Sequence, residues 1–418
     1  MKVLNISTYD YEGAASATYR LHRNLLANNI ESKMLVSKKT KNDDTLIEIE
    51  RTKFNRFKNS LFDKLDGKLK IYRGKYNFID KQRYVNASSE EIIKKLDFKP
   101  TIIVLHWISN FLSLKVIYEL QQYYNAKVFW YQMDMAPMTG GCHYAWDCTG
   151  YQTDCSNCPA IRWIKQDSPM KFLEYKKKYI DLMNITPITG GKFVQRQVES
   201  SYLFKNQTFK KVMLGLDSNL FKPSENVIEL KKKYNLNETN KRIVFFPSYD
   251  IRNERKGFKY LLNALEILEN KNPETKDTLL LLTAGHVENK ILSEVTTYEV
   301  RHLGYLDSDK KLTEAYQLAD LFISASIEDS GPMMVAESIL SGVPVLAFNM
   351  GLAEDLITDG ITGYVAELKN SNDLMEKLQC FLNLNNKEIE VMKNNCYSLG
   401  LKELTYETQL NYFIKAIK

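Results

Sequence analysis

The chain has 418 residues, 26% of them charged, and a formal net charge of +6. This length predicts two or three domains that each bury a large core, and the composition is that of an ordinary soluble globular protein. Apolar runs such as 102–108 are too short to span a bilayer, and the first residues enter a strand-like segment without a secretory signal peptide. The sequence therefore predicts a cytoplasmic protein.

The positive charge is concentrated in residues 51–84, which hold 11 Lys or Arg against 3 Asp or Glu, so the rest of the chain is close to neutral. Apolar residues recur there at helical spacing: Phe54, Phe57, Leu61, Leu65 and Leu69. This pattern predicts a basic amphipathic helix. Two interpretations stay open, a peripheral contact of residues 51–72 with an anionic membrane, or packing of the apolar stripe against the protein itself.

Strands and helices are predicted to alternate along most of the chain. It opens with a strand at 2–8, a helix at 16–28 and a strand at 33–37, with Gly13 in the first turn. Further strands are predicted at 101–107, 127–131, 242–247, 278–284, 300–306, 319–325 and 345–348, and further helices from 258 onward, at 333–340 and at 404–418. This alternation is typical of parallel α/β sheets.

Four of the six cysteines, Cys142, Cys148, Cys155 and Cys158, fall in one loop at 134–159 with the spacing C-x5-C-x6-C-x2-C. Four thiolates so close in sequence predict a closed, structural Zn²⁺ site. Reduced thiols, two disulfides or an iron–sulfur cluster are the alternatives. Gly140 and Gly141 precede the first cysteine and predict an intrinsically loose chain there.

The most informative stretch is 324–363, where a buried strand leads through an acidic, glycine-containing loop into a helix and a second strand. Asp329 and Glu337 lie eight positions apart, and Glu328 precedes Asp329. Ligands of open α/β sheets bind at the carboxyl ends of strands, and a helix N-terminus offers free N–H groups to an anion.

This stretch resembles the donor-sugar motif of retaining family-4 glycosyltransferases of the GT-B fold. The resemblance implies two Rossmann-like α/β domains facing across a cleft. It places an acceptor-side domain at 1–222, a domain that binds the nucleotide sugar at 223–403, and a C-terminal helix at 404–418 that crosses back to the first domain.

The resemblance also implies roles for individual residues. Either acid of the pair Glu328 and Asp329 contacts hydroxyls of the donor sugar, and Glu337 holds the ribose. Lys256, with Arg252 or Arg255, binds the diphosphate. The remaining donor contacts come from backbone groups at Gly13, Tyr305, Ser330, Gly331 and Met333.

A second set of pieces resembles bacterial family-4 enzymes that build surface polysaccharides. These pieces are His106-Trp107 at a strand end, the run from Thr139 to Tyr144, and the closing Cys155-x-x-Cys158-Pro159. Met133 stands before Asp134 where that subset usually has a histidine. The acceptor-side candidates are therefore His106, Asp134 and His143, although His106 could equally be a satisfied histidine at a strand end.

The reaction implied is transfer of a sugar from a nucleoside-diphosphate donor to a hydroxyl of a glycan or lipid-linked acceptor, with retention at the anomeric carbon. It implies no catalytic metal and no nucleic-acid partner, and a place in the cytoplasm or at the inner face of the membrane. The alternatives are a GT-B epimerase, or a zinc-containing nucleic-acid-binding protein that would explain the cysteines and the basic segment.

Overall fold

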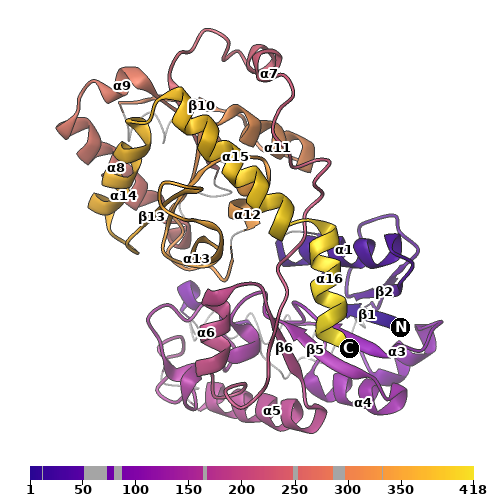
Figure 1. The fold of residues 1–418 in the computed structure, drawn as a ribbon. Coiled ribbons are helices and arrows are strands. Elements are labelled where there is room, and N and C mark those ends of the chain that lie inside the picture. The colour runs from indigo at the N-terminus through magenta and orange to yellow at the C-terminus, as the bar shows by residue number, and fades with distance from the viewer. Residues whose placement is uncertain are drawn as a thin grey trace. The chain divides into compact units, whose positions relative to one another are not determined.

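The computed structural model describes residues 1–11, 13–50, 73–79, 87–162, 167–247, 253–285, 297–331 and 333–418 (Figure 1). The predicted amphipathic helix at 51–72 lies outside them. The chain divides into an N-terminal unit, Met1–Gly215 with Leu410–Lys418, and a C-terminal unit, Leu216–Gln409. The boundary after Gly215 thus lies a few residues before the predicted domain boundary at 222.

The N-terminal unit contains a seven-stranded parallel sheet in the order β3-β2-β1-β4-β5-β6-β7. The strands are β1 (Lys2–Ile6), β2 (Glu31–Val36), β3 (Leu46–Glu48), β4 (Ile102–Leu105), β5 (Lys127–Tyr131), β6 (Thr186–Thr189) and β7 (Lys210–Lys211). Its helices are α1 (Gly13–Ala27), α3 (Ser89–Lys95), α4 (Leu114–Tyr124), α5 (Ser168–Met183) and α6 (Lys192–Ser200). Short 3₁₀ turns are η1 (Gly74–Tyr76), η2 (Ala136–Met138) and η3 (Gly150–Gln152).

The C-terminal unit contains a six-stranded parallel sheet in the order β10-β9-β8-β11-β12-β13. The strands are β8 (Arg242–Pro247), β9 (Leu279–Ala284), β10 (Glu299–His302), β11 (Leu321–Ser324), β12 (Val345–Phe348) and β13 (Gly363–Ala366). Its helices are α7 (Val227–Lys233), η5 (Glu254–Lys256), α8 (Phe258–Lys271), α9 (Thr275–Thr278), α11 (Asp309–Leu318), α12 (Met333–Leu340), α13 (Ala353–Leu356), α14 (Ser371–Leu382) and α15 (Asn386–Glu403). The predicted α/β class with two Rossmann-like sheets is therefore confirmed.

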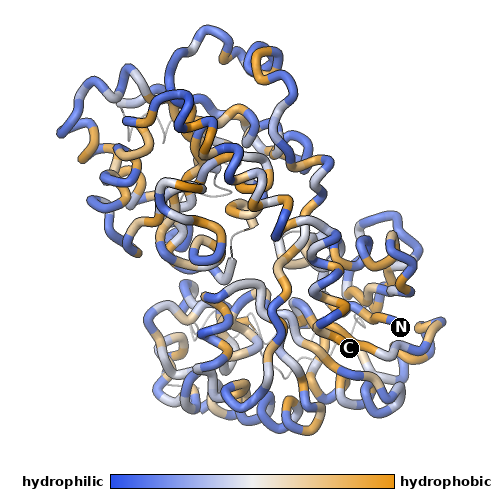
Figure 2. The backbone as a smooth tube through the Cα atoms, in the orientation of Figure 1, coloured by the Kyte–Doolittle hydropathy of each residue, from blue (hydrophilic) through white to orange (hydrophobic). Residues whose placement is uncertain are grey.

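Both faces of the N-terminal sheet are buried, which explains why its strands read as continuous apolar runs. Along β4, Ile103 and Leu105 belong to one core cluster while Ile102 and Val104 belong to another. The second cluster is completed by the last helix, α16 (Tyr406–Ile417), whose residues from Leu410 onward belong to the N-terminal unit. Figure 2 shows orange and blue alternating along α16, the pattern of a helix with one apolar face.

None of the described helices is both long and apolar enough to cross a membrane.

Truncation of Phe413 tests whether α16 is an integral part of this core. Phe413 is fully buried in the cluster, so Phe413→Ala should lower the free energy of unfolding by about 3–5 kcal/mol through lost burial and an unfilled cavity. All four tryptophans lie between residues 107 and 163, so tryptophan fluorescence during urea unfolding reports on the N-terminal unit.

Tyr412→Ala is the matched control, because the neighbouring Tyr412 is 45% exposed and its loss should cost less than about 1 kcal/mol. Equal effects of the two substitutions would show that α16 does not contribute to the core.

Candidate functional site

The strand order of the C-terminal sheet reverses between β8 and β11. β8 pairs with β9 on one side and with β11 on the other, so the segments that follow β8 and β11 leave the sheet next to each other. Such a switch point is where open parallel sheets bind their ligands. Of the predicted donor residues, Arg255 and Lys256 follow β8, whereas Glu328, Asp329, Ser330, Gly331, Met333 and Glu337 follow β11.

A tight turn brings the first segment against the second. Asn253 caps η5 by accepting a hydrogen bond from Arg255 N, and the turn ends at Gly257 with φ +64°. A Cβ at Gly257 would lie 1.8 Å from the carbonyl oxygen of Ala325, so only glycine fits. The backbone N–H of Ile327 donates to the carbonyl of Arg255 at 2.8 Å. The two backbones are thus fixed in direct contact.

The contact places a cation beside a carboxylate. Lys256 Nζ lies 2.8 Å from Asp329 Oδ2, and Gly331 N donates to Asp329 Oδ1 at 3.2 Å. Burial alone would raise the pKa of Asp329, but the Lys256 charge and hydrogen bond, with the charge of Arg255, lower it below its usual value. Asp329 is therefore ionised at neutral pH. The guanidinium of Arg255 donates to the carbonyl of Glu328 at 3.2 Å, which brings a second cation to the same loop.

Glu337 lies on α12 and is only 4% exposed. The hydroxyl of the fully buried Tyr316, on α11, donates to Glu337 Oε2 at 3.2 Å. Glu337 is therefore not a solvated residue on the helix surface. Tyr316 was not anticipated, because no local pattern connects a residue on one helix to a carboxylate on the next.

The other predicted donor contacts are spread more widely. Ser330, Gly331 and Met333 are half-buried in the connection between β11 and α12, and Tyr305 follows β10 with 54% of its surface exposed. Gly13 begins α1 in the N-terminal unit, and the protein leaves open space where its Cβ would stand. Arg252 lies outside the described residues.

The N-terminal sheet has its own switch point between β1 and β4, and a polar cluster lies there. Trp107 Nε1 donates to Asp134 Oδ2 at 3.0 Å, and His143 Nδ1 lies 2.5 Å from the same oxygen. Asp134 Oδ1 also accepts from Ala136 N at 2.8 Å. Asp134 thus orients both rings, and the structure brings two of the three predicted acceptor-side residues into direct contact. The sequence pointed to Trp107 only as the residue after His106 at a strand end and predicted no contact for its ring.

His106, the third acceptor-side candidate, is 2% exposed at the end of β4. Its Nε2 lies 3.0 Å from Asn5 Oδ1, so Nε2 carries the proton and donates. Burial lowers the pKa of His106 to about 3, which keeps the ring neutral. Among the described residues, neither His106 Nδ1 nor the buried His143 Nε2 has a hydrogen-bond partner. Unpaired buried polar atoms are rare enough to mark these two rings as functional candidates.

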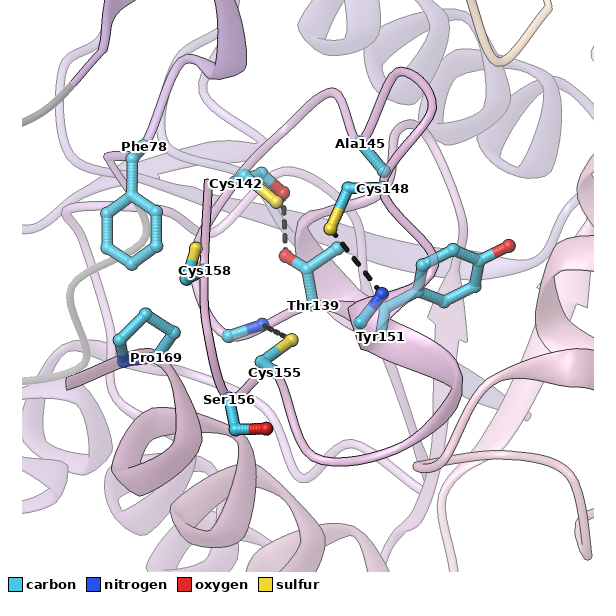
Figure 3. A pocket seen from close by; sticks show the side chains of 12 residues that line it. Phe78, Thr139, Cys142, Ala145, Cys148, Tyr151, Cys155, Ser156, Cys158 and Pro169 are labelled. Atoms are coloured by element: carbon cyan, nitrogen blue, oxygen red, sulfur yellow. Dashed lines mark hydrogen bonds between the residues drawn. The ribbon is translucent and has the colours of Figure 1, made fainter. Parts of the chain in front are cut away.

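The four clustered cysteines line one enclosed cavity of about 10 Å³ (Figure 3). All six cysteines of the chain are free in this structure, so the disulfide alternative is not supported. Burial raises the pKa of Cys155 to about 12. Within the described part of the chain, no group of three or more His, Cys, Asp or Glu is arranged to hold a metal ion as its side chains stand.

The expected looseness at Gly140 and Gly141 is wrong. A Cβ at Gly140 would lie 2.3 Å from the carbonyl oxygen of Pro169, and one at Gly141 would lie 2.6 Å from the ring of Phe78. Glycine is needed at both positions because two other segments of the chain pack directly against the backbone there. From the sequence alone, a glycine required by close packing looks the same as a glycine that provides flexibility.

Substitution of Gly257 tests the contact on which the C-terminal site depends. In Gly257→Ala the methyl group would collide with Ala325 O and the residue would keep a left-handed φ, so we expect a loss of at least about 3 kcal/mol of stability in the C-terminal unit. Differential scanning calorimetry measures this loss.

Gly360→Ala serves as its control, because Gly360 has φ +73° but open space around a Cβ, and should cost only about 1–2 kcal/mol. If both variants lost the same stability, the collision with Ala325 would not exist in solution.

Comparisons with known proteins agree with this geometry. Residues 226–398 match the family described as Glycosyl transferases group 1. An uncharacterized 41.2 kDa protein in the cps region of Klebsiella pneumoniae is 27% identical over 173 residues, which are 39% of this chain and 46% of that protein. N,N'-diacetylbacillosaminyl-diphospho-undecaprenol alpha-1,3-N-acetylgalactosaminyltransferase of Campylobacter jejuni is 23% identical over 208 residues, 46% of this chain and 54% of that enzyme. Each match thus spans about half of the relative's length.

The fold comparison covers both units. An Anabaena protein solved in complex with UDP-glucose matches with a TM-score of 0.63 at 13% identity, over 99% of this chain and 98% of that one. At this identity the likeness concerns the fold. The chain therefore has the GT-B fold of two Rossmann-like domains, and its residues 226–398 are similar to the glycosyl transferases group 1 family.

Proposed function

We propose that this protein is a retaining hexosyltransferase that moves a sugar from a nucleoside-diphosphate donor to a hydroxyl acceptor. The observation that carries the proposal is the pairing of Lys256 with Asp329 at the switch point of the group 1 domain. A partly exposed ammonium beside a carboxylate suits a ligand that carries both phosphate and sugar hydroxyls. The Anabaena structure of the same fold was solved with UDP-glucose, which supports this class of donor.

Lys256 and Arg255 act on the leaving group. When the bond from sugar to phosphate breaks, negative charge grows on the diphosphate, and cations already fixed in place stabilise that charge. Lys256 is 31% exposed in its side chain, so its ammonium is accessible to a phosphate while Asp329 keeps it oriented. Arg252 is the alternative partner of Lys256 in this role.

The acidic groups recognise hydroxyls. Glu328 or Asp329 accepts hydrogen bonds from the donor sugar, and Glu337 accepts them from the ribose, because an ionised carboxylate is an acceptor with two oxygens. The amides of Ser330, Gly331 and Met333 precede or begin α12, where N–H groups suit a phosphate, and the Gly331 amide would exchange its hydrogen bond to Asp329 for one to the donor. Gly13 and the backbone at Tyr305 complete the proposed donor contacts.

Asp134, His143 and His106 form the proposed acceptor side. In the proposed mechanism the departing phosphate assists removal of the acceptor proton, so these residues orient the acceptor and do not serve as a general base. The mechanism uses no catalytic metal, and it delivers the acceptor hydroxyl to the face of the sugar that the phosphate leaves, which gives retention.

The acceptor is proposed to be a glycan or a lipid-linked intermediate of bacterial surface-polysaccharide synthesis at the cytoplasmic face of the membrane. Two relatives support this pathway: one lies in a cps region, and the name of the other contains a diphospho-undecaprenol acceptor. The group 1 match favours this function over a zinc-containing nucleic-acid-binding protein, which would leave residues 226–398 unexplained.

Lys256→Ala tests the leaving-group role. A thermal-shift screen against nucleoside-diphosphate sugars first identifies a donor, because a ligand that binds the native state stabilises it. With that donor, Lys256→Ala should lower kcat by about 100-fold or more, since the lost interaction is strongest in the transition state. Release of nucleoside diphosphate measures turnover.

Lys259→Ala is the matched control, because Lys259 lies three positions away on the exposed side of α8 and should leave kcat unchanged. Lys256→Arg keeps the charge and should retain more activity than Lys256→Ala. Near-normal turnover of a folded Lys256→Ala enzyme would refute the assignment.

The proposed peripheral contact of residues 51–72 with an anionic membrane has a separate test. The protein should sediment with vesicles that contain anionic lipid and should be released as salt rises. Replacing Lys64 and Lys68 by Gln should weaken binding about 30-fold, since each basic residue near the surface contributes about 1 kcal/mol.

Lys231→Gln with Lys232→Gln, on α7, makes the same change in net charge and should leave vesicle binding intact. If equal amounts of protein sedimented with neutral and anionic vesicles, the membrane contact would be refuted. Packing of the apolar stripe against the protein would then explain the pattern of residues 51–72.

A further inference from the structure

The cysteine-containing loop has little regular structure to hold it. Between β5 and α5 the described residues contain only the single turns η2 and η3. Part of the loop packs, with η1, around a small cluster whose buried members are Tyr76, Phe78, Cys142, Ala160 and Ile161. Another part, which includes Ala145, Tyr151 and Cys155, packs into the main core of the N-terminal unit. Trp146, Cys155 and Asn157 adopt left-handed φ angles near +50°, which non-glycine residues rarely do. A segment with so little regular structure, packed partly on a small cluster, would gain stability from a cross-link.

The cysteines converge on one place, with Cys155 contributed by the main core and the other three by the small cluster. Figure 3 shows Cys142, Cys148, Cys155 and Cys158 around the same cavity, although they are spread along the loop from 142 to 158. The cavity of about 10 Å³ has room for one small ion or one water molecule. Phe78, Ala145 and Pro169 contribute apolar walls.

Backbone groups of the loop are turned toward the sulfurs. Gly140 N donates to Cys155 Sγ at 3.3 Å, and Gly150 N donates to Cys148 Sγ at 3.4 Å. A thiol is a weak acceptor, whereas a thiolate is a strong one, so N–H donors to two of the four sulfurs suit thiolates that bind a metal.

A buried cation lies next to the same cluster. Lys176 on α5 has no exposed surface, and its Nζ donates to the carbonyls of Ala136 and Thr139 at 2.6 and 3.0 Å. The peptide that joins Thr139 to Gly140 therefore binds the ammonium through its C=O and Cys155 Sγ through its N–H. Four thiolates around a divalent ion carry a net charge of −2, and a buried ammonium linked through one peptide group offsets part of it.

From this arrangement we infer that Cys142, Cys148, Cys155 and Cys158 bind one Zn²⁺ ion, which cross-links the loop. Four sulfur ligands in a closed, partly apolar site suit tetrahedral zinc and leave no position for substrate, so the ion is structural. Since no group in the described residues is arranged for a metal as the side chains stand, the sulfurs must close on the ion by rotation about Cα–Cβ. Binding then releases thiol protons and contributes to the folding free energy of the loop.

Elemental analysis of the full-length protein, purified without added metal, tests the inference directly. We expect about one zinc per chain, and about none in Cys155→Ser and Cys158→Ser. Cys380→Ser is the matched control, because Cys380 is an exposed free cysteine on α14 and its variant should keep the zinc. A wild-type protein that contains no zinc and takes up none from a zinc-buffered, reducing solution would overturn the site.

Measurements on the wild-type chain keep the test independent of variants that fail to fold. Replacement of the bound ion by Co²⁺ should give the visible bands of tetrahedral thiolate coordination, and chelation should lower the Tm seen by tryptophan fluorescence. The proposal would be overturned if the protein bound iron in place of zinc. It would also be overturned if four of the six thiols failed to react after denaturation without reductant because they form disulfides. None of these readouts depends on transfer activity, so the proposed function and the zinc site can fail separately.

Discussion

The donor-site geometry depends on one contact between two backbones, that of Gly257 against the carbonyl of Ala325. Lys256 precedes the contact directly, and Asp329 follows it by four residues, so the main chain brings the two residues within reach of their 2.8 Å ion pair. This matters for the proposed catalysis, because a charge that is already in place costs no reorganisation when the leaving group develops its own charge. A left-handed glycine and one backbone hydrogen bond, from Ile327 to Arg255, are enough to fix the arrangement.

The N-terminal unit depends in a different way on residues distant in sequence. Its second core cluster contains Val3 from the first strand and Phe413 and Ile417 from the last helix. The chain therefore passes between the two units twice, after Gly215 and again after Gln409. During synthesis, this cluster cannot be completed until residues 410–418 have been made. The C-terminal unit, which ends at Gln409, therefore has its full sequence before the N-terminal unit does.

The sequence predicts those features of this protein that are local or periodic. The helix Met333–Leu340 and the strands Lys127–Tyr131, Arg242–Pro247 and Val345–Phe348 have the predicted bounds, because apolar runs and turn residues determine them directly. Contacts between distant segments were not predictable from the residues themselves. Nothing local shows that Glu337 is buried under Tyr316, or that Gly140 is required by the approach of Pro169. Both depend on which elements become neighbours, which only the folded sheet decides.

The two switch points of this chain differ in charge, and the difference fits the proposed division of labour. The C-terminal one gathers the cations of Lys256 and Arg255 around a carboxylate loop, an arrangement that attracts a diphosphate. At the N-terminal one, the carboxylate of Asp134 contacts the rings of Trp107 and His143, beside a His106 that burial keeps neutral. Such groups form directional hydrogen bonds without a strong attraction for anions, which suits an uncharged hydroxyl. The same sheet topology is thus suited to a charged ligand in one unit and to a polar, uncharged group in the other.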